Sequence, residues 1–272
     1  LTMAAGTALT ANNGDVMLSG FKATLNNIVN ASANSFNWTF GNNVATNGTI
    51  NAGAGNIALT STAGAITTGV SGLLVGNNVA LTASTGIAAN TTATGLEATT
   101  TNGDVSIVET DGVSLSAGGL NSTNGAVDLR TTNGAIDTAA GLVNAGTTVS
   151  IIASGTGNDV TIGSGTVTAA GNVDIASTGN VNVDGTVSGA DVSITALGGE
   201  IIGTGNARTA TISGANISLG AVAGIYADTV TSGDWDINNI GVGDIDVTNT
   251  GTPTVGLTTG SKVSNSGGGN IT

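Results

Sequence analysis

The residues best suited to chemistry in this sequence are aromatic and acidic, and they lie close together late in the chain. Asp234 and Asp236 flank Trp235, and Tyr226 precedes them by a few residues. Exposed aromatic rings beside carboxylates can stack on a sugar while the carboxylates accept hydrogen bonds from its hydroxyl groups. Tyr226, Asp234, Trp235 and Asp236 are therefore the candidates for ligand binding.

The same acidic group raises the question of catalysis, because it continues with Asp244 and Asp246. Polysaccharide hydrolases need paired carboxylates that flank the bond, and lyases need calcium-binding acids together with a basic residue. No Lys, Arg or His lies near this group in sequence, and the chain contains neither His nor Cys. The sequence therefore predicts a protein that is not an enzyme, with no catalytic residue, metal site or cofactor; a glycan-cleaving module remains the enzymatic alternative.

A second aromatic group, Phe36, Trp38 and Phe40, alternates along the chain and so shares one face of an expected strand. Both aromatic groups coincide with stretches that interrupt a repeat, at residues 21–50 and 225–246. A sugar-binding platform is one interpretation of them. We favour another, in which each stretch is a side loop or extra hairpin whose aromatic rings cover the flank of the fold.

Composition and charge exclude several classes of protein. The chain has 45 Gly, 1 Pro and 2% aromatic residues, yet it is rich in Val, Ile and Thr, which disordered segments lack. A net charge of -13, from 17 acidic and 4 basic residues, argues against nucleic acid and anionic membranes as partners. The longest apolar runs, such as 73–75 and 221–227, are far too short for a membrane span.

An internal repeat organises the sequence. Two Val, Ile or Leu residues flank one small or polar residue at intervals of about 22 residues. Asp or Asn usually precedes such a pair, often after Gly, as is typical of turns. Two intervals are long, at 26 residues from Val79 to Val105 and 28 from Ile217 to Ile245. The pairs are Val16/Leu18, Ile57/Leu59, Val79/Leu81, Val105/Ile107, Val127/Leu129, Val149/Ile151, Val173/Ile175, Val192/Ile194, Ile217/Leu219 and Ile245/Val247.

Each repeat contains further apolar strands. A second follows the first after 8 to 11 residues, for example at Ile66, Ile136 and Val160, and a third is expected near Leu120, Leu142 and Val167. One coil alone buries too few apolar side chains to offset the entropy of ordering about 22 residues, so the coils must stack. The sequence therefore predicts an all-β fold, a right-handed parallel β-helix (β-solenoid) of about eleven coils with three short strands per coil.

The residue between the two apolar residues of a pair is expected to face outward and to stack on its equivalent in the next coil. Two carboxylates stacked at about 4.8 Å would repel by up to about 1 kcal/mol even in water. Ser150 separates Asp128 from Asp174 in this predicted column, which avoids that repulsion. The full column is Ala58, Ala80, Ser106, Asp128, Ser150, Asp174, Ser193, Ser218 and Asp246.

We expect residues 1–272 to form a single β-helical segment from a longer chain. The last residues, 267–272, resemble the opening of another coil at 55–60, and no capping segment is recognisable. The alternative is that copies associate end to end, since an uncapped solenoid leaves unpaired strand edges.

Residues 171–185 and 102–107 resemble the central repeats of filamentous haemagglutinin-like proteins, which are large exported bacterial adhesins and contact-dependent toxin carriers. The resemblance implies a β-helical shaft at the bacterial cell surface or outside the cell. Its implied function is structural or adhesive, with a glycan or a receptor on a host or neighbouring cell as partner. The alternatives are a glycan-binding or glycan-cleaving module and the stalk of a toxin-delivery protein.

Overall fold

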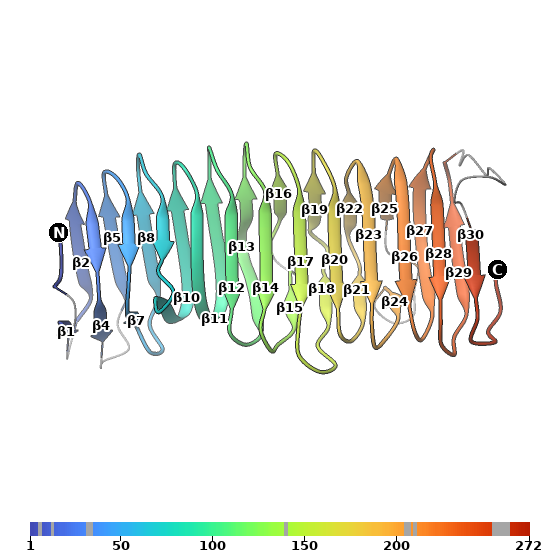
Figure 1. Cartoon of the computed structure of the whole chain (residues 1–272), viewed down its shortest axis with the longest axis horizontal. Coiled ribbons are helices and arrows are strands. Elements are labelled where there is room, and N and C mark those ends of the chain that lie inside the picture. The colour runs from blue at the N-terminus through green and yellow to red at the C-terminus, as the bar shows by residue number, and fades with distance from the viewer. Residues whose placement is uncertain are drawn as a thin grey trace.

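The protein is described by a computed structural model that covers residues 1–4, 7–11, 14–30, 35–138, 141–203, 208, 211–251 and 262–272. The strands among these residues all pair in parallel and stack into a β-solenoid of about 11 turns with roughly 21 residues per turn. No helix occurs among the described residues. The coils form an elongated rod with the two chain ends at opposite ends of it (Figure 1). The all-β solenoid predicted from the repeat is confirmed.

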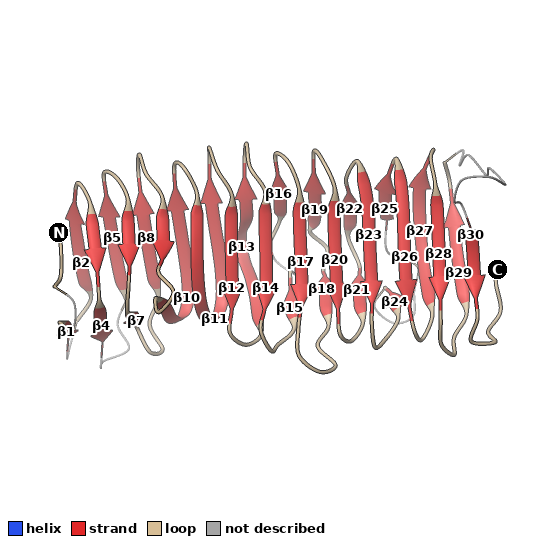
Figure 2. Ribbon diagram, in the orientation of Figure 1, coloured by secondary structure: helices blue, strands red, loops and turns tan. Residues whose placement is uncertain are grey.

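Three ladders of strands form the sides of the coil, and we call them faces 1, 2 and 3 in the order in which the chain visits them from β2 onward (Figure 2). Face 1 contains β2 (Val16–Gly20), β5 (Phe36–Phe40), β8 (Ile57–Ser61), β16 (Val143–Ala145), β19 (Thr166–Ala169), β22 (Thr186–Ser188) and β25 (Thr211–Gly214). Face 2 contains β3 (Ala23–Leu25), β6 (Val44–Thr46), β9 (Ile66–Thr68), β12 (Val105–Glu109), β14 (Val127–Thr131), β17 (Val149–Ala153), β20 (Val173–Ser177), β23 (Asp191–Ala196), β26 (Asn216–Ala221), β28 (Trp235–Asn239) and β30 (Lys262–Asn265).

Face 3 contains strands of two to four residues. They are β1 (Ala8–Ala11), β4 (Asn27–Asn30), β7 (Thr49–Asn51), β15 (Ile136–Asp137), β18 (Val160–Ile162), β21 (Val181–Val183) and β24 (Ile201–Ile202). Five further strands bend around a corner and take part in more than one face. These are β10 (Leu73–Ala83), β11 (Ile87–Thr100), β13 (Val113–Ser122), β27 (Ile225–Thr231) and β29 (Ile245–Asn249).

The apolar pairs point into the coil, as their alternation predicts. On face 2, Val127 lies in register with Val149, and Val149 with Val173; all are almost fully buried. Leu129 continues the neighbouring inward column. Each inward side chain therefore packs on its equivalents above and below, which makes the core one continuous apolar column.

Turn residues before the strands connect successive coils through their side chains. The Asp159 carboxylate accepts a hydrogen bond from the Asn180 backbone amide at 2.7 Å, and the Asn180 side-chain oxygen accepts one from the Glu200 amide at 3.0 Å. The Asp104 carboxylate does the same for Ala126 at 2.8 Å. Asp and Asn therefore recur before the strands because their oxygens satisfy backbone donors where the ladders are interrupted.

The aromatic group of residues 36–40 lies inside the coil, and the expectation of a side loop or hairpin is wrong there. Phe36, Trp38 and Phe40 are fully buried on β5, which pairs in register with β2 and β8. The Trp38 Nε1 donates a hydrogen bond to the Val16 carbonyl at 2.9 Å, and the Phe36 and Trp38 ring centroids lie 5.1 Å apart. Their alternation matches the inward positions of the repeat, and the indole N–H finds a backbone acceptor.

The two long intervals of the repeat arise from a change of face. Val79 lies in register with Leu96 on face 1, whereas Val105 pairs with Ile87 on face 2. At the other end, Ile217 pairs with Trp235 on face 2, and Ile245 pairs with Ile225 on face 3. The inward pairs have the same apolar pattern on every face. The spacing of these pairs therefore did not distinguish one long coil from two consecutive pairs that lie on different faces.

In one coil the inward residue of the third strand is Val143 and not Leu142, which the repeat pattern predicted. Leu142 is 52% exposed, and Val143 is the buried residue that stacks on Leu120 and Val167. Leu is the bulkier apolar residue, but the pleat allows only one of two adjacent residues to face the core.

Candidate functional site

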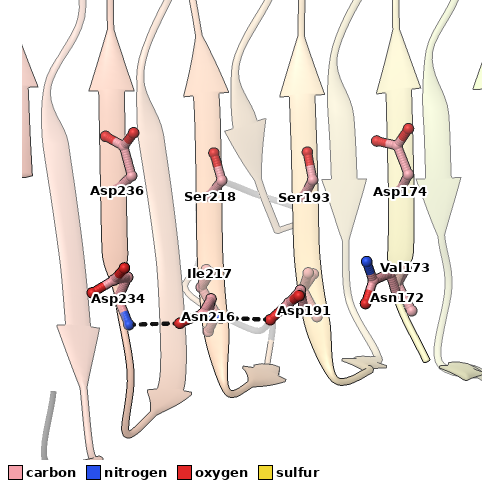
Figure 3. Close-up of a pocket in the computed structure, with 11 residues that line it drawn as sticks. Asn172, Val173, Asp174, Asp191, Ser193, Asn216, Ile217, Ser218, Asp234 and Asp236 are labelled. Carbon is pink, nitrogen blue, oxygen red and sulfur yellow. Dashed lines mark hydrogen bonds between the residues drawn. The ribbon is translucent and has the colours of Figure 1, made fainter. Parts of the chain in front are cut away.

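The candidate site is a groove on the outside of face 2, crossed by strands β20, β23, β26 and β28. A hollow of about 410 Å³ runs over these strands, and its polar lining comes from two parallel rows (Figure 3). One row consists of the residues at or just before the start of each strand, and the other of the outward residues two positions later. The rows are Asn172, Asp191, Asn216 and Asp234, and Asp174, Ser193, Ser218 and Asp236.

The row at the strand starts is partly held by hydrogen bonds between coils. The Asn216 Nδ2 donates to the Asp191 carboxylate at 2.7 Å, and the Asp234 backbone amide donates to the Asn216 Oδ1 at 2.9 Å (Figure 3). Asn216 thus uses both ends of its amide to connect two acidic residues. This arrangement fixes the Asp191 side chain and the Asp234 backbone along the groove.

The outward row is set by strand register. Asp174 is aligned with Ser193, Ser193 with Ser218, and Ser218 with Asp236. Two serines therefore separate the carboxylates at the two ends of the row. The next residue in this column beyond Asp236 is Lys262 on β30.

The groove is acidic and rich in hydrogen-bonding groups. Asp174, Asp191, Asp234 and Asp236 contribute carboxylates, and none of the described residues that line the groove is basic. Ser and Asn side chains add hydroxyl and amide groups that both donate and accept. The groove can therefore bind polyhydroxylated or cationic groups through hydrogen bonds. The described residues contain no cluster of three or more Asp, Glu, His or Cys side chains suited to holding a metal ion.

The candidate residues from the sequence do not form one surface. Asp234 and Asp236 lie together in the groove on face 2. Trp235 points to the opposite side of the same strand, where it pairs with Ile217 and packs against the core while partly buried. Tyr226 lies on face 3, in register with Asp246. The two aromatic residues therefore cannot act with these two carboxylates as a single stacking platform.

The predicted outward column is confirmed from Ser106 to Ser218 and wrong at both ends. Ser106, Asp128, Ser150, Asp174, Ser193 and Ser218 follow one another in register on face 2. Ala58 and Ala80 belong to face 1, and Asp246 belongs to face 3. Asp236 occupies the position expected for Asp246, because Trp235/Ile237 is the inward pair that the repeat pattern missed.

Three ion pairs lie on the outer surface of the described part of the chain. The Arg130 Nε lies 2.9 Å from the Asp128 carboxylate on β14, and this hydrogen bond and charge raise the pKa of the Arg130 guanidinium. On face 3 the Arg208 guanidinium lies 2.8 Å from Asp246 and 3.9 Å from Asp228. All these groups are substantially exposed, so each pair contributes little to stability.

A buried acid that sequence reasoning missed lies at the end of β12. Glu109 is fully buried, and its carboxylate accepts hydrogen bonds from the Thr91 hydroxyl and from the Ala93 and Thr110 amides. Burial, supported by a hydrogen bond with Asp111, raises the pKa of Glu109 to about 7. The signal that could have found it is its place two residues after Ile107, which the alternation assigns to the interior.

No helix among the described residues has the length and apolarity of a membrane span. Comparison of the chain with protein-family models, with curated proteins and with solved structures gives no match. The chain is thus characterised by its architecture, a repetitive β-solenoid with an acidic groove along one face.

Proposed function

We propose that this chain is a non-catalytic shaft segment of a fibre at a bacterial cell surface or outside the cell. The observation that supports the proposal is the parallel pairing of strands in successive coils through about 11 turns. Repeated coils create length in proportion to the number of residues, at about 4.8 Å per coil. A rod of this kind holds whatever lies at its ends at a fixed distance.

The proposal extends to the type of fibre. The repeats resemble those of filamentous haemagglutinin-like adhesins, and a β-solenoid is the architecture that this resemblance implies. In such a fibre the segment adds length between the cell and the adhesive part of the fibre. The receptor of the fibre is a glycan or another molecule on a facing cell. The stalk of a contact-dependent toxin-delivery protein also requires a long rod that holds its ends at a fixed distance, so this function is the close alternative.

A shaft can be tested by removing whole turns. Val127, Val149 and Val173 occupy equivalent positions, so deleting residues 127–172 removes two turns and rejoins the ladders in phase. We expect a folded rod that is shorter by about 10 Å in small-angle X-ray scattering. Deleting residues 127–137 is the control, because it moves every later strand to the wrong face and should abolish folding.

Function is then compared between the full chain and the two-turn deletion on the surface of bacteria that display them. A shaft should keep attachment of these cells to their target, because the deleted turns contribute only length. Loss of attachment in the folded two-turn deletion would contradict the proposal. Compact, non-elongated particles of the full chain in electron micrographs would contradict it as well.

A second candidate function, glycan binding, is favoured by the groove on face 2. Its carboxylates, hydroxyls and amides recur at the coil spacing, which suits an extended chain of hydroxylated units. The test is binding to a polysaccharide panel, comparing the wild type with an Asp174→Asn/Asp236→Asn variant and with Tyr226→Phe on face 3 as control. Loss of binding only in the double variant supports this function, and release of reducing ends would indicate cleavage. Absence of binding to every polysaccharide would count against it.

A further inference from the structure

The tripeptide Thr-Asn-Gly occurs four times in turns of the solenoid, at Asn47, Asn102, Asn124 and Asn133. Asn followed by Gly is the sequence most prone to lose its side-chain amide, because Gly leaves the next backbone nitrogen unhindered. All four Asn residues are exposed to solvent. The four sites share the residues Thr-Asn-Gly, so a difference in their rates of deamidation must come mainly from the fold.

At two of these sites the attacking nitrogen is engaged. The Gly125 amide donates a hydrogen bond to the Ser122 Oγ at 2.9 Å, and Gly125 itself is buried. The Gly134 amide donates to the Ser154 carbonyl at 3.2 Å. Attack by either nitrogen first requires that hydrogen bond to break.

At the other two sites the nitrogen is available. Within the described part of the chain, the amides of Gly103 and Gly48 donate no hydrogen bond. The Asn102 side-chain oxygen accepts a hydrogen bond from the Asn124 Nδ2 at 3.0 Å, which polarises the carbonyl group that would be attacked. Gly103 has φ +154°, and a Cβ there would lie 2.1 Å from the Thr85 carbonyl oxygen, so the fold requires this Gly.

We propose that Asn102 and Asn47 are sites of spontaneous deamidation in the folded protein, whereas Asn124 and Asn133 are protected. At Asn102 the Gly103 nitrogen loses its proton to solvent and bonds to the Asn102 Cγ. The Cγ–Nδ2 bond breaks, and ammonia leaves with a proton taken from solvent, which yields a cyclic succinimide. Water then opens the ring at one of its two carbonyl groups to give aspartate or isoaspartate.

The two products affect the coil differently. Aspartate retains an oxygen that can accept the hydrogen bond from the Asn124 Nδ2. Isoaspartate inserts one extra main-chain carbon into the turn before β12, where Asp104 connects this coil to Ala126 of the next. Both products add a negative charge to an already acidic chain.

Peptide mapping by tandem mass spectrometry tests the proposal on the full chain aged in mildly alkaline buffer. We expect Asn102 and Asn47 to react about three- to tenfold faster than Asn124 and Asn133. At the two protected sites the Gly amide must first break a hydrogen bond, and the net free energy of one such bond slows the reaction by a factor of that size. In denaturant the four sites should react at similar rates. Isoaspartyl methyltransferase labelling measures the isoaspartate fraction independently.

The Ser122→Ala variant provides the decisive comparison. It removes the acceptor that holds the Gly125 amide, so Asn124 should become several-fold more reactive while Asn133 is unchanged. Equal rates at all four sites in the folded protein would overturn the proposal. An unchanged rate at Asn124 in folded Ser122→Ala would also overturn it, because the hydrogen bond would then not be the protecting element.

Discussion

Glu109 makes the stability of this protein depend on pH in an uncommon direction. Its pKa is raised from 4.5 to about 7 in the folded state, chiefly by burial. Between these two values the folded protein binds more protons at this residue than the unfolded chain does. Its contribution to stability is therefore complete below about pH 4.5 and is lost as the pH rises to about 7.

The Glu109→Gln variant tests this dependence. A shift of this size corresponds to about 3 kcal/mol at most, so we expect wild-type stability to fall by a few kcal/mol from acidic to neutral pH. The variant should lack that fall, because Gln does not titrate. The measurement is the urea midpoint as a function of pH, with Glu97→Gln on the outer surface of face 1 as control. A wild-type profile that rises with pH over this range would show the assignment to be wrong.

Trp38 and Trp235 should respond very differently to truncation. Trp38 is fully buried and hydrogen-bonded to the Val16 carbonyl, so Trp38→Ala should reduce the free energy of unfolding by about 3–5 kcal/mol. Trp235 is only partly buried, so Trp235→Ala should cost less. Thermal denaturation followed by circular dichroism compares the two. Similar losses would contradict the difference in burial.

At the scale of the strand, the repeat pattern predicted which residues face the core but not always on which side of the coil they lie. Alternation correctly placed Val127, Val149 and Val173 in one inward column. It failed between Val79 and Val105, because consecutive apolar pairs there belong to different faces. The face to which a strand belongs depends on the geometry of the corners and on the register between coils. No particular residue type marks either of them.

The sequence predicted only some of the acidic residues that line the groove, for a related reason. Asp234 and Asp236 are close in sequence and were identified together. Asp174 and Asp191 lie beside them because successive coils stack, so neighbours in space are separated by about one coil in sequence. A stacked site can be read from sequence only once the register of every coil between its residues is known.

Charge spacing along the outward column of face 2 should contribute measurably to strand pairing. Ser150 lies in register between Asp128 and Asp174, so Ser150→Asp would place three carboxylates in consecutive coils. We expect a loss of about 1 kcal/mol per adjacent pair, relieved by added salt. Ser150→Asn is the neutral control, and thermal denaturation at low and high salt is the measurement. A salt-independent effect would show that packing, not charge, is responsible.

On the scale of the whole molecule, stability accumulates from interfaces between coils. In the described part of the chain, each coil pairs with the one before it and the one after it. Such stacks behave as nearest-neighbour systems, in which local defects are tolerated if the adjoining interfaces remain intact. This organisation explains how one rod can accommodate the aromatic interior of β5 and the buried acid at Glu109.

The orientation of the strands has a mechanical consequence. Because the strands run across the rod, their inter-coil hydrogen bonds lie along its long axis. A pull on the two chain ends would load the bonds of the outermost coil one after another, as in the opening of a zipper. Single-molecule extension should therefore show low, repeated rupture forces, each releasing a contour length of about 70–80 Å for a coil of about 22 residues. Such a rod resists bending and sideways compression far better than it resists being unwound from an end.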